Sequence, residues 1–236
     1  MESLVLFAKA PVLGKVKTRL AGELGEEAAL RLYTAFLFDI VDVCAEWRRQ
    51  TVAADPNRRL ILYATPDAED PILAECARRS GARCAVQPDG DLGERLQAIF
   101  EQEFARGARA VCAIGSDSPT LPLHLVEHAF RALQWERVVL GPSFDGGYWT
   151  IGAQRPAPDL FTDIPWSTDR VVEATLERTA REGVASHLLP FWYDVDEPED
   201  LRTLVWHLKA LRAQRKDACP ATWQVLVDLG LAGRKA

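Results

Sequence analysis

The chain has 236 residues, of which 48% are hydrophobic and 26% charged, and its formal net charge is −6. This length and composition are typical of a globular protein that buries its own core in one larger domain. The acidic balance argues against general binding to nucleic acid or to an anionic membrane, because both need a positive surface. It leaves room for a local basic pocket that binds a small anion.

Apolar runs that fit buried strands alternate along the chain with patterns that fit amphipathic helices. The expected strands are 3–7, 59–65, 83–87, 110–114, 137–140, 149–152 and 187–196. The expected helices are 26–47, 70–80, 92–106, 122–134, 168–182, 199–214 and 223–229. This alternation predicts an α/β fold with a mostly parallel sheet covered on both faces. We expect one domain over 1–236, with 212–236 as a C-terminal helical extension, and a ligand site beyond the carboxyl ends of the strands.

Four basic residues and no acidic residue follow the first expected strand, in the loop 8–22. Lysine and arginine side chains bind phosphate oxygens, and glycine lets the backbone approach a ligand closely. The predicted phosphate-binding residues are Lys9, Gly14, Lys15, Lys17 and Arg19. A solvated positive loop is the common alternative for such a charge run, but its position after the first strand favours an anion site.

Carboxylates follow two further expected strands. Asp117 lies beside the expected phosphate site, where Mg²⁺ or Mn²⁺ shared with substrate phosphates would relieve the repulsion. A turn or a helix cap is the alternative use for Asp117. Asp194 and Asp196 fall on the same side of the last expected strand because side chains alternate. We favour Asp196 as the second metal ligand, although it also fits the N-cap of the next helix.

The segment 141–149 has the sequence GPSFDGGYW. Asp-Gly-Gly between two extended runs is a hairpin signal. Flat rings beside glycines also suit a sugar or a similar polyol. The predicted acceptor or sugar site is Gly146, Gly147, Tyr148 and Trp149, with Asp145 as a catalytic base for an acceptor hydroxyl group.

Two weaker patterns lie on expected helices. Residues 124–128, HLVEH, match a short zinc-peptidase motif, but no third ligand accompanies them, and a helix that flanks the sheet explains them better. Leu204, Trp206, Leu208 and Leu211 form an apolar stripe. This stripe either closes the core or makes a homodimer contact.

Five scattered cysteines form neither a CxxC pair nor a disulfide framework, which favours a reducing compartment. The N-terminus lacks the positive region and the long apolar stretch of a signal peptide. No apolar run is long enough to span a bilayer. We therefore expect a cytoplasmic protein without a membrane span.

Five motifs occur in order along the chain: FAKAPVLGKVKTRLA, IGSDSPTLP, LGPSFDGGYWTIG, DIPWST and DVDEPEDL. Together they closely resemble the bacterial family-A glycosyltransferases linked with radical-SAM, selenium or arsenosugar pathways. The resemblance extends over nearly the whole chain and is weakest after about Leu211. It is specific for the family and much less specific for the substrate.

The resemblance implies a nucleotide-diphospho-sugar transferase fold, which is a Rossmann-like three-layer α/β/α sandwich with a mixed sheet. It also implies kinship with nucleotidyltransferases, including guanylyltransferases. In these relatives the first loop grips nucleotide phosphates and two aspartates bind a divalent metal. Carried onto this chain, the loop corresponds to Lys9, Lys15, Lys17 and Arg19, and the metal ligands correspond to Asp117 and Asp196.

Two motifs depart from the patterns of these relatives. Many such glycosyltransferases carry Asp-x-Asp after the fourth strand, whereas this chain has Ser116-Asp117-Ser118. Many nucleotidyltransferases carry Gly-Gly-x-Gly in the first loop, whereas this loop has only Gly14 before the lysines. Neither activity is identified by its own signature.

Three functions therefore remain open. The leading hypothesis is a metal-dependent glycosyltransferase that uses a nucleotide-diphospho-sugar and a small-molecule acceptor, with Asp117 and Asp145 as catalytic residues. The alternative is a nucleotidyltransferase that attacks a nucleoside triphosphate and releases pyrophosphate. A nucleotide-binding module without turnover is the least favoured, because candidate ligands gather at three strand ends.

Overall fold

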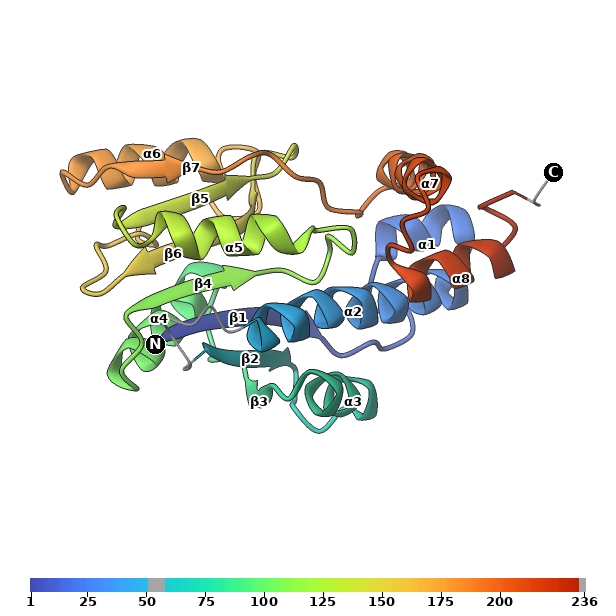
Figure 1. Cartoon of the computed structure of the whole chain (residues 1–236), viewed down its shortest axis with the longest axis horizontal. Helices are drawn as coiled ribbons and strands as arrows, with labels where there is room; N and C mark the ends of the chain where they lie inside the picture. Colours follow the sequence, from blue (N-terminus) through green and yellow to red (C-terminus); the bar gives the residue numbers. More distant parts are fainter. Residues whose placement is uncertain (51–57, 234–236) are drawn as a thin grey trace.

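The computed structural model describes residues 1–50 and 58–233. A seven-stranded sheet lies between two layers of helices, and three further helices lie beyond one end of the sheet (Figure 1). The predicted α/β class with a mostly parallel sheet is confirmed. The last three residues of the expected extension 212–236 lie outside the described part.

The strand order is β3-β2-β1-β4-β6-β5-β7. The strands are β1 (Glu2–Lys9), β2 (Arg58–Thr65), β3 (Arg83–Val86), β4 (Ala110–Ile114), β5 (Val138–Pro142), β6 (Tyr148–Gln154) and β7 (Ser186–Leu188). Only β6 runs against its neighbours, pairing antiparallel with β4 and with β5. The carboxyl ends of the six other strands therefore meet at one edge of the sheet.

The helices are α1 (Thr18–Leu24), α2 (Glu26–Arg49), α3 (Pro71–Ser80), α4 (Leu92–Ala105), α5 (Leu123–Ala132), α6 (Val171–Arg181), α7 (Pro198–Ala213) and α8 (Pro220–Asp228). Residues of α2, α3 and α5 pack on one face of the sheet, and residues of α4 and α6 pack on the other. Helices α1, α7 and α8 lie together beyond the carboxyl ends of the strands (Figure 1). No helix in the described ranges has the length and apolar character to cross a bilayer.

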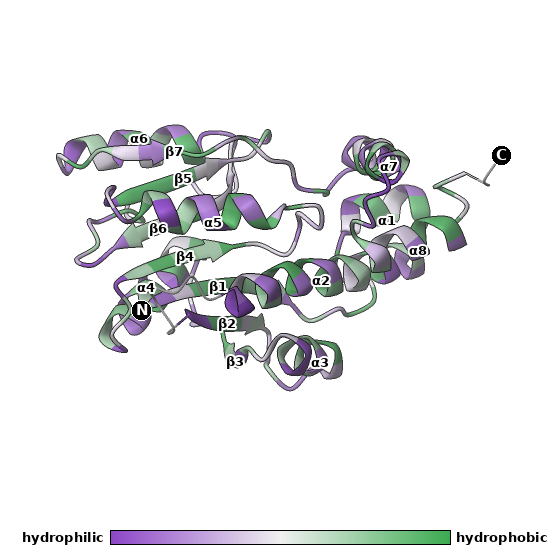
Figure 2. Cartoon of the chain, in the orientation of Figure 1, coloured by the Kyte–Doolittle hydropathy of each residue, from purple (hydrophilic) through white to green (hydrophobic). Residues whose placement is uncertain are grey.

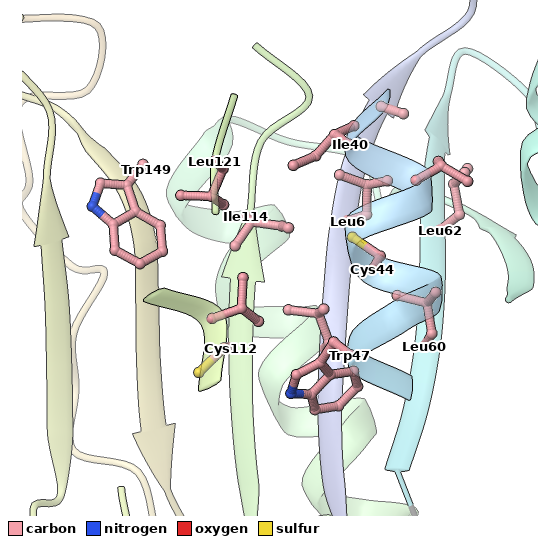
Figure 3. Packing of buried hydrophobic residues seen from close by; sticks show 14 of the residues in the cluster. Leu6, Ile40, Cys44, Trp47, Leu60, Leu62, Cys112, Ile114, Leu121 and Trp149 are labelled. Carbon is pink, nitrogen blue, oxygen red and sulfur yellow. The ribbon is translucent and has the colours of Figure 1, made fainter. Parts of the chain in front are cut away.

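The first core layer shows why α2 packs where it does. Leu6 and Leu62 of the sheet face Ile40, Cys44 and Trp47, which recur at helical spacing on α2 (Figure 3). All five side chains are at most 1% exposed. Fully burying one apolar side chain of this size contributes about 1.5–3 kcal/mol. Figure 2 shows the same division, with polar and apolar bands along the helices and a largely apolar β5.

A third apolar cluster joins α8 to the N-terminal half of α2. Asp39, 4% exposed, accepts backbone hydrogen bonds from Ala221 at 3.1 Å and from Thr222 at 2.7 Å. These two N–H groups lie in the first turn of α8, where a helix has unpaired donors and a partial positive charge. Burial raises the pKa of the Asp39 carboxyl, although the hydrogen bonds from α8 oppose the shift.

Two predicted features at the C-terminal side differ from the structure. The expected strand 187–196 is wrong over most of its length, because β7 ends at Leu188 and Pro190 follows. Proline has no N–H to donate to a ladder, and beyond Pro190 an isolated bridge joins Trp192 to Ser143. The apolar stripe on α7 is also divided: Leu204 and Leu208 are fully buried, whereas Trp206 is 69% exposed.

The structure assigns other roles to the HLVEH motif and confirms the hairpin. Glu127 accepts two hydrogen bonds from Arg58, at 2.8 and 3.0 Å, so it serves an ion pair on the sheet's flank. The Asp-Gly-Gly segment joins β5 to β6 as an antiparallel hairpin, with Ser143 N donating to Gly147 O at 2.8 Å.

Candidate functional site

Three segments that are distant in the sequence meet beyond the carboxyl ends of β1 and β4. They are the loop after β1, the loop after β4 and the segment between β7 and α7. The Val195 N–H donates to the Asp117 carbonyl at 2.9 Å and ties the last two together. Two adjoining cavities of about 570 and 450 Å³ open at this junction.

We name the two cavities by the charge of their walls. The basic pocket, the larger one, includes Lys9, Lys15, Lys17 and Arg19 in its lining. The acidic pocket, the smaller one, includes Asp117, Asp145, Asp169, Asp194 and Asp196. Asp117, Asp196 and Arg19 line both cavities. The aspartates proposed as metal ligands thus lie at the boundary between a basic and an acidic space.

Lys17 is the centre of this boundary. Its ammonium nitrogen donates to Asp196 Oδ1 at 2.8 Å and makes a shorter contact with Asp117 Oδ1. The Lys17 side chain is only 3% exposed, whereas both carboxylates are about 40% exposed. Burial alone would lower the pKa of Lys17, but the two carboxylates outweigh burial and raise it above its ordinary value.

The backbone of Lys17 is fixed as firmly as its side chain. It adopts a left-handed conformation, with φ 46° and ψ 45°, at the N-cap of α1. A non-glycine residue keeps such a conformation only where its surroundings hold it there. The Lys17 carbonyl accepts a hydrogen bond from Ala21 at 2.9 Å, and the ammonium lies 5.9 Å from the centroid of the Tyr33 ring.

Tyr33 on α2 connects the loops after β1 and β4. Its hydroxyl accepts from Lys9 N at 2.9 Å, donates to Lys9 O at 3.0 Å and lies 3.1 Å from Ser116 Oγ. Burial, and next the nearby Asp117 charge, raise the pKa of Tyr33 to about 12. The helical spacing of Tyr33 predicted a core residue and gave no sign of this second role.

The other predicted phosphate-binding residues are more exposed. Lys9 Nζ donates to the Lys15 carbonyl at 2.7 Å, and Lys15 itself faces solvent at the pocket wall. Arg19 pairs with Glu197 at 3.3 Å, with both side chains more than half exposed. Gly14 has φ 68°, as its turn requires, but it lies outside the lining of the basic pocket.

The structure excludes a helix-cap role for Asp117 and for Asp196, and their role as metal ligands stays a prediction. Glu197, not Asp196, is the N-cap of α7, in a capping box with Asp200. Pro122 is the N-cap of α5, so Asp117 caps no helix. Both carboxylates are therefore turned to Lys17 and to the pockets.

Asp194 is held apart from that pair. Its Oδ1 accepts a hydrogen bond from Ser143 Oγ at 3.0 Å. Burial raises the pKa of Asp194 to about 6, and the charges of Asp145 and Asp196 add to the shift. Like charges around one cavity disfavour further ionisation, so burial and the neighbouring aspartates both act against the charged form of Asp194.

The hairpin between β5 and β6 forms one wall of the acidic pocket. Asp145 is exposed, and its Oδ1 accepts from Gly147 N at 2.9 Å, which is an Asx turn. Gly146 has φ 87°, and a Cβ there would lie 1.9 Å from the carbonyl oxygen of Asp169. Glycine at 146 thus permits close approach of the hairpin to the segment before α6.

The predicted aromatic platform is only partly available. Trp149 is 4% exposed within the core and donates its indole N–H to Pro190 O at 3.1 Å (Figure 3). Trp149 nevertheless also lines the acidic pocket, so its contact with a sugar stays a prediction. Tyr148 lines the acidic pocket and lies edge-on to Trp166, with ring centroids 6.3 Å apart. Trp166 also lines that pocket, so it is a further ring beside the predicted Tyr148 and Trp149.

The donor set at Asp117 and Asp196 fits a particular kind of metal site. Within residues 1–50 and 58–233, no three histidine, cysteine, aspartate or glutamate side chains form a ligand cluster. Mg²⁺ commonly takes one or two carboxylates and completes its shell with water and substrate phosphates. The two aspartates beside the basic pocket fit a divalent cation that binds together with a nucleotide, rather than a cage for a cation alone.

A protein-family model matches residues 48–168, slightly more than half of the chain. Its description is "Uncharacterized protein conserved in bacteria (DUF2064)". The chain belongs to this family. No curated protein matched the DUF2064 chain in sequence.

Several solved structures similar to this DUF2064 chain are named as transferases. A putative nucleotide-diphospho-sugar transferase from Desulfovibrio desulfuricans G20 is 30% identical, with a TM-score of 0.81 over 98% of this chain and 97% of its own. A nucleotidyl transferase from Methanothermobacter thermautotroptrophicus has 16% identity and a TM-score of 0.58, over 89% and 98%. A cytidylyltransferase from Leptospira borgpetersenii has 12% identity and a TM-score of 0.54, over 100% and 98%. The last two show a shared fold alone.

Proposed function

We propose that the chain is a glycosyltransferase that moves a sugar from a nucleotide-diphospho-sugar to a small-molecule acceptor. One observation carries this proposal: two adjoining pockets of opposite charge share Asp117 and Asp196. In a nucleotide-diphospho-sugar, the anionic diphosphate joins a nucleoside to a sugar that carries no charge of its own. The charge of the two pockets suits the diphosphate on the basic side and the sugar with its acceptor on the acidic side.

Different residues of the chain would bind the diphosphate, take the acceptor proton and contact the sugar. Lys9, Lys15 and Arg19 would bind the diphosphate and stabilise the charge that develops on the leaving nucleoside diphosphate. Asp145 would take the proton from the acceptor hydroxyl group, and its exposure at the pocket wall permits this. Tyr148 and Trp166 would offer ring surface to the sugar.

Asp117 and Asp196 would hold Mg²⁺ or Mn²⁺, which when bound supplies Lewis-acid stabilisation of the diphosphate. We propose that the enzyme acts in the cytoplasm and is grouped with the radical-SAM, selenium or arsenosugar-linked transferases that its motifs resemble. A homodimer through the exposed Trp206 of α7 is part of the same proposal.

Nucleotidyl transfer is the second candidate, supported by the basic pocket directly after β1, where a triphosphate would also bind. Its acceptor would carry a phosphate or carboxylate group and would have to enter a cavity lined by five aspartates. Repulsion between like charges disfavours such an acceptor. The acidic pocket therefore supports glycosyl transfer over nucleotidyl transfer.

A thermal-shift screen tests the proposal. The panel contains nucleotide-sugars, nucleoside diphosphates and nucleoside triphosphates, each with and without Mn²⁺. We expect metal-dependent stabilisation by one nucleotide-sugar, followed by release of its nucleoside diphosphate on incubation with polyol acceptors. Stabilisation by a triphosphate alone, with release of pyrophosphate, would favour the second candidate. Binding without turnover on any acceptor would contradict both.

A further inference from the structure

Lys17 occupies the position between Asp117 and Asp196 that a shared cation would take. We propose that Lys17 is an internal counter-ion that keeps a divalent cation off this aspartate pair until a diphosphate group binds and draws the ammonium away. The diphosphate is that of the donor in the proposed function, so the inference rests on it. Lys17 is in this sense a positioning residue for the metal.

The ammonium and a bridging cation exclude each other. Lys17 Nζ already lies 2.8 Å from Asp196 Oδ1 and closer to Asp117 Oδ1. A divalent ion needs to lie about 2.0–2.6 Å from carboxylate oxygens. An ion on those two oxygens would therefore be in direct contact with a positive nitrogen. Repulsion between the two cations makes simultaneous occupation unfavourable.

Lys17 has little contact with open solvent away from the aspartates. Its side chain is 3% exposed, and its ammonium lies 5.9 and 5.8 Å from the ring centroids of Tyr33 and Phe36. The left-handed backbone fixes where the side chain starts. The ammonium needs another anionic partner nearby if it is to release the carboxylates.

The basic pocket is where such a partner would arrive. Lys17 is part of its lining, together with Lys9, Lys15 and Arg19. Diphosphate oxygens in this pocket would accept the ammonium and free both carboxylates for a metal ion, which the same phosphates would help to ligate. Diphosphate and metal would then favour each other's binding by the same factor, as linkage requires.

A purely structural role for Lys17 predicts a different outcome. If the ammonium only braces the two loops, its removal would loosen Asp117 and Asp196 and weaken any cation site. If it competes with the cation, its removal leaves two carboxylates facing one another without a counter-ion, and the site would bind a cation more tightly. The sign of the change in metal affinity distinguishes the two roles.

The experiment is a Mn²⁺ titration of the full chain without nucleotide, followed by the electron paramagnetic resonance signal of free Mn²⁺. We expect Lys17→Met to bind Mn²⁺ about tenfold or more tightly than the wild type, because a unit charge in direct contact is removed. Lys17→Gln keeps a hydrogen-bond donor without the charge and provides a second variant if the methionine protein does not fold. It should show the same gain.

Lys15→Met is the matched control, because it removes an exposed lysine of the same loop. It should leave the Mn²⁺ affinity near that of the wild type. Unchanged or weaker binding in both Lys17 variants would overturn the proposal, and so would an equal gain in Lys15→Met. Failure of the wild type to turn over any nucleotide-sugar would sink the proposed reaction while leaving the Mn²⁺ result to stand or fall separately.

Discussion

The basic and acidic pockets share an edge but are built in different ways. The basic pocket is formed by loops that directly follow the parallel strands β1 and β4, so its residues are near neighbours of buried strands. The acidic pocket is formed by the β5–β6 turn, the segment before α6 and the irregular segment after β7. Regular strands position the side chains of the basic pocket, whereas turns and close backbone contacts position those of the acidic pocket.

The difference suggests a division between a general half and a selective half. Strand ends fix the side proposed to bind phosphate, which would need only positive charge at a constant place. Loops shape the acceptor side and can vary without disturbing the sheet. Changes in the acidic pocket should therefore alter turnover and acceptor choice, and changes in the basic pocket should alter donor binding.

The largest expected effect is at the boundary between the pockets. Asp117→Asn should reduce glycosyl transfer by about 10³-fold, since one of the two carboxylates that would hold the divalent cation against the leaving diphosphate is lost. The measurement is kcat for the donor identified by the thermal screen. Asp169→Asn, an exposed aspartate of the acidic pocket, is the matched control and should stay within a few-fold of the wild type. Equal losses in both variants would mean that Asp117 acts only through the pocket's total charge.

The next effect tests whether close contact holds the acidic side together. Gly146→Ala should cost about 3 kcal/mol of unfolding free energy, because its Cβ would meet the Asp169 carbonyl and because φ is 87°. Urea denaturation measures this. Gly22→Ala is the control: Gly22 lies within α1 with nothing within 4 Å of its Cβ position, and alanine there should be neutral or stabilising. A tolerated Gly146→Ala would contradict a rigid hairpin wall.

A substitution at Asp145 can distinguish a catalytic role from a structural role in the turn. Asn at 145 can still accept the Gly147 N–H and keep the Asx turn, but it cannot take a proton. We expect Asp145→Asn to lower kcat by about 10²-fold with little change in the donor KM. An unaltered kcat would leave Asp145 with its turn role alone.

Asp194 gives a pH test of the acidic pocket. Its pKa is raised by burial and like charges to about 6, so the folded state loses stability as the pH rises from the ordinary aspartate pKa through 6. Asp194→Asn removes this loss and keeps an acceptor for Ser143. Above pH 6, the melting temperature of the variant in EDTA should exceed that of the wild type by an amount equivalent to about 1 kcal/mol of unfolding free energy, allowing for partial solvent screening. This difference should disappear in acid. A gain independent of pH would contradict the cause assigned here.

The smallest effect concerns an exposed charge of the basic pocket. Lys15→Met should weaken donor binding by about 0.5–1 kcal/mol at low salt and by less at high salt, because the contact is solvent-screened. Lys209→Met, an exposed lysine of α7 outside both pockets, should change nothing. Equal weakening at all salt concentrations would show a desolvated phosphate contact instead.

The sequence by itself determined the alternation of strands and helices, and it predicted that charged residues would gather beyond the carboxyl ends of the strands, where the two pockets lie. Apolar periodicity predicts the strands and helices, and the residues directly after β1 and β4 predict where charged side chains gather. Both patterns are local in the sequence. It could not determine that Lys17 turns inward to Asp117 and Asp196, because those contacts join residues 100 and 179 positions apart.

Tertiary structure decided the remaining points. Trp149 is buried because β6 is a central strand, and sequence pattern alone does not reveal strand order. The last strand ends at Leu188 because Pro190 has no N–H to donate, although β5 continues to Pro142 and the run after Pro190 is aromatic and strand-like. The local sequence determines which helices and strands form and which residues carry charge. Packing between elements that are distant in the sequence determines which of these charged residues come into contact.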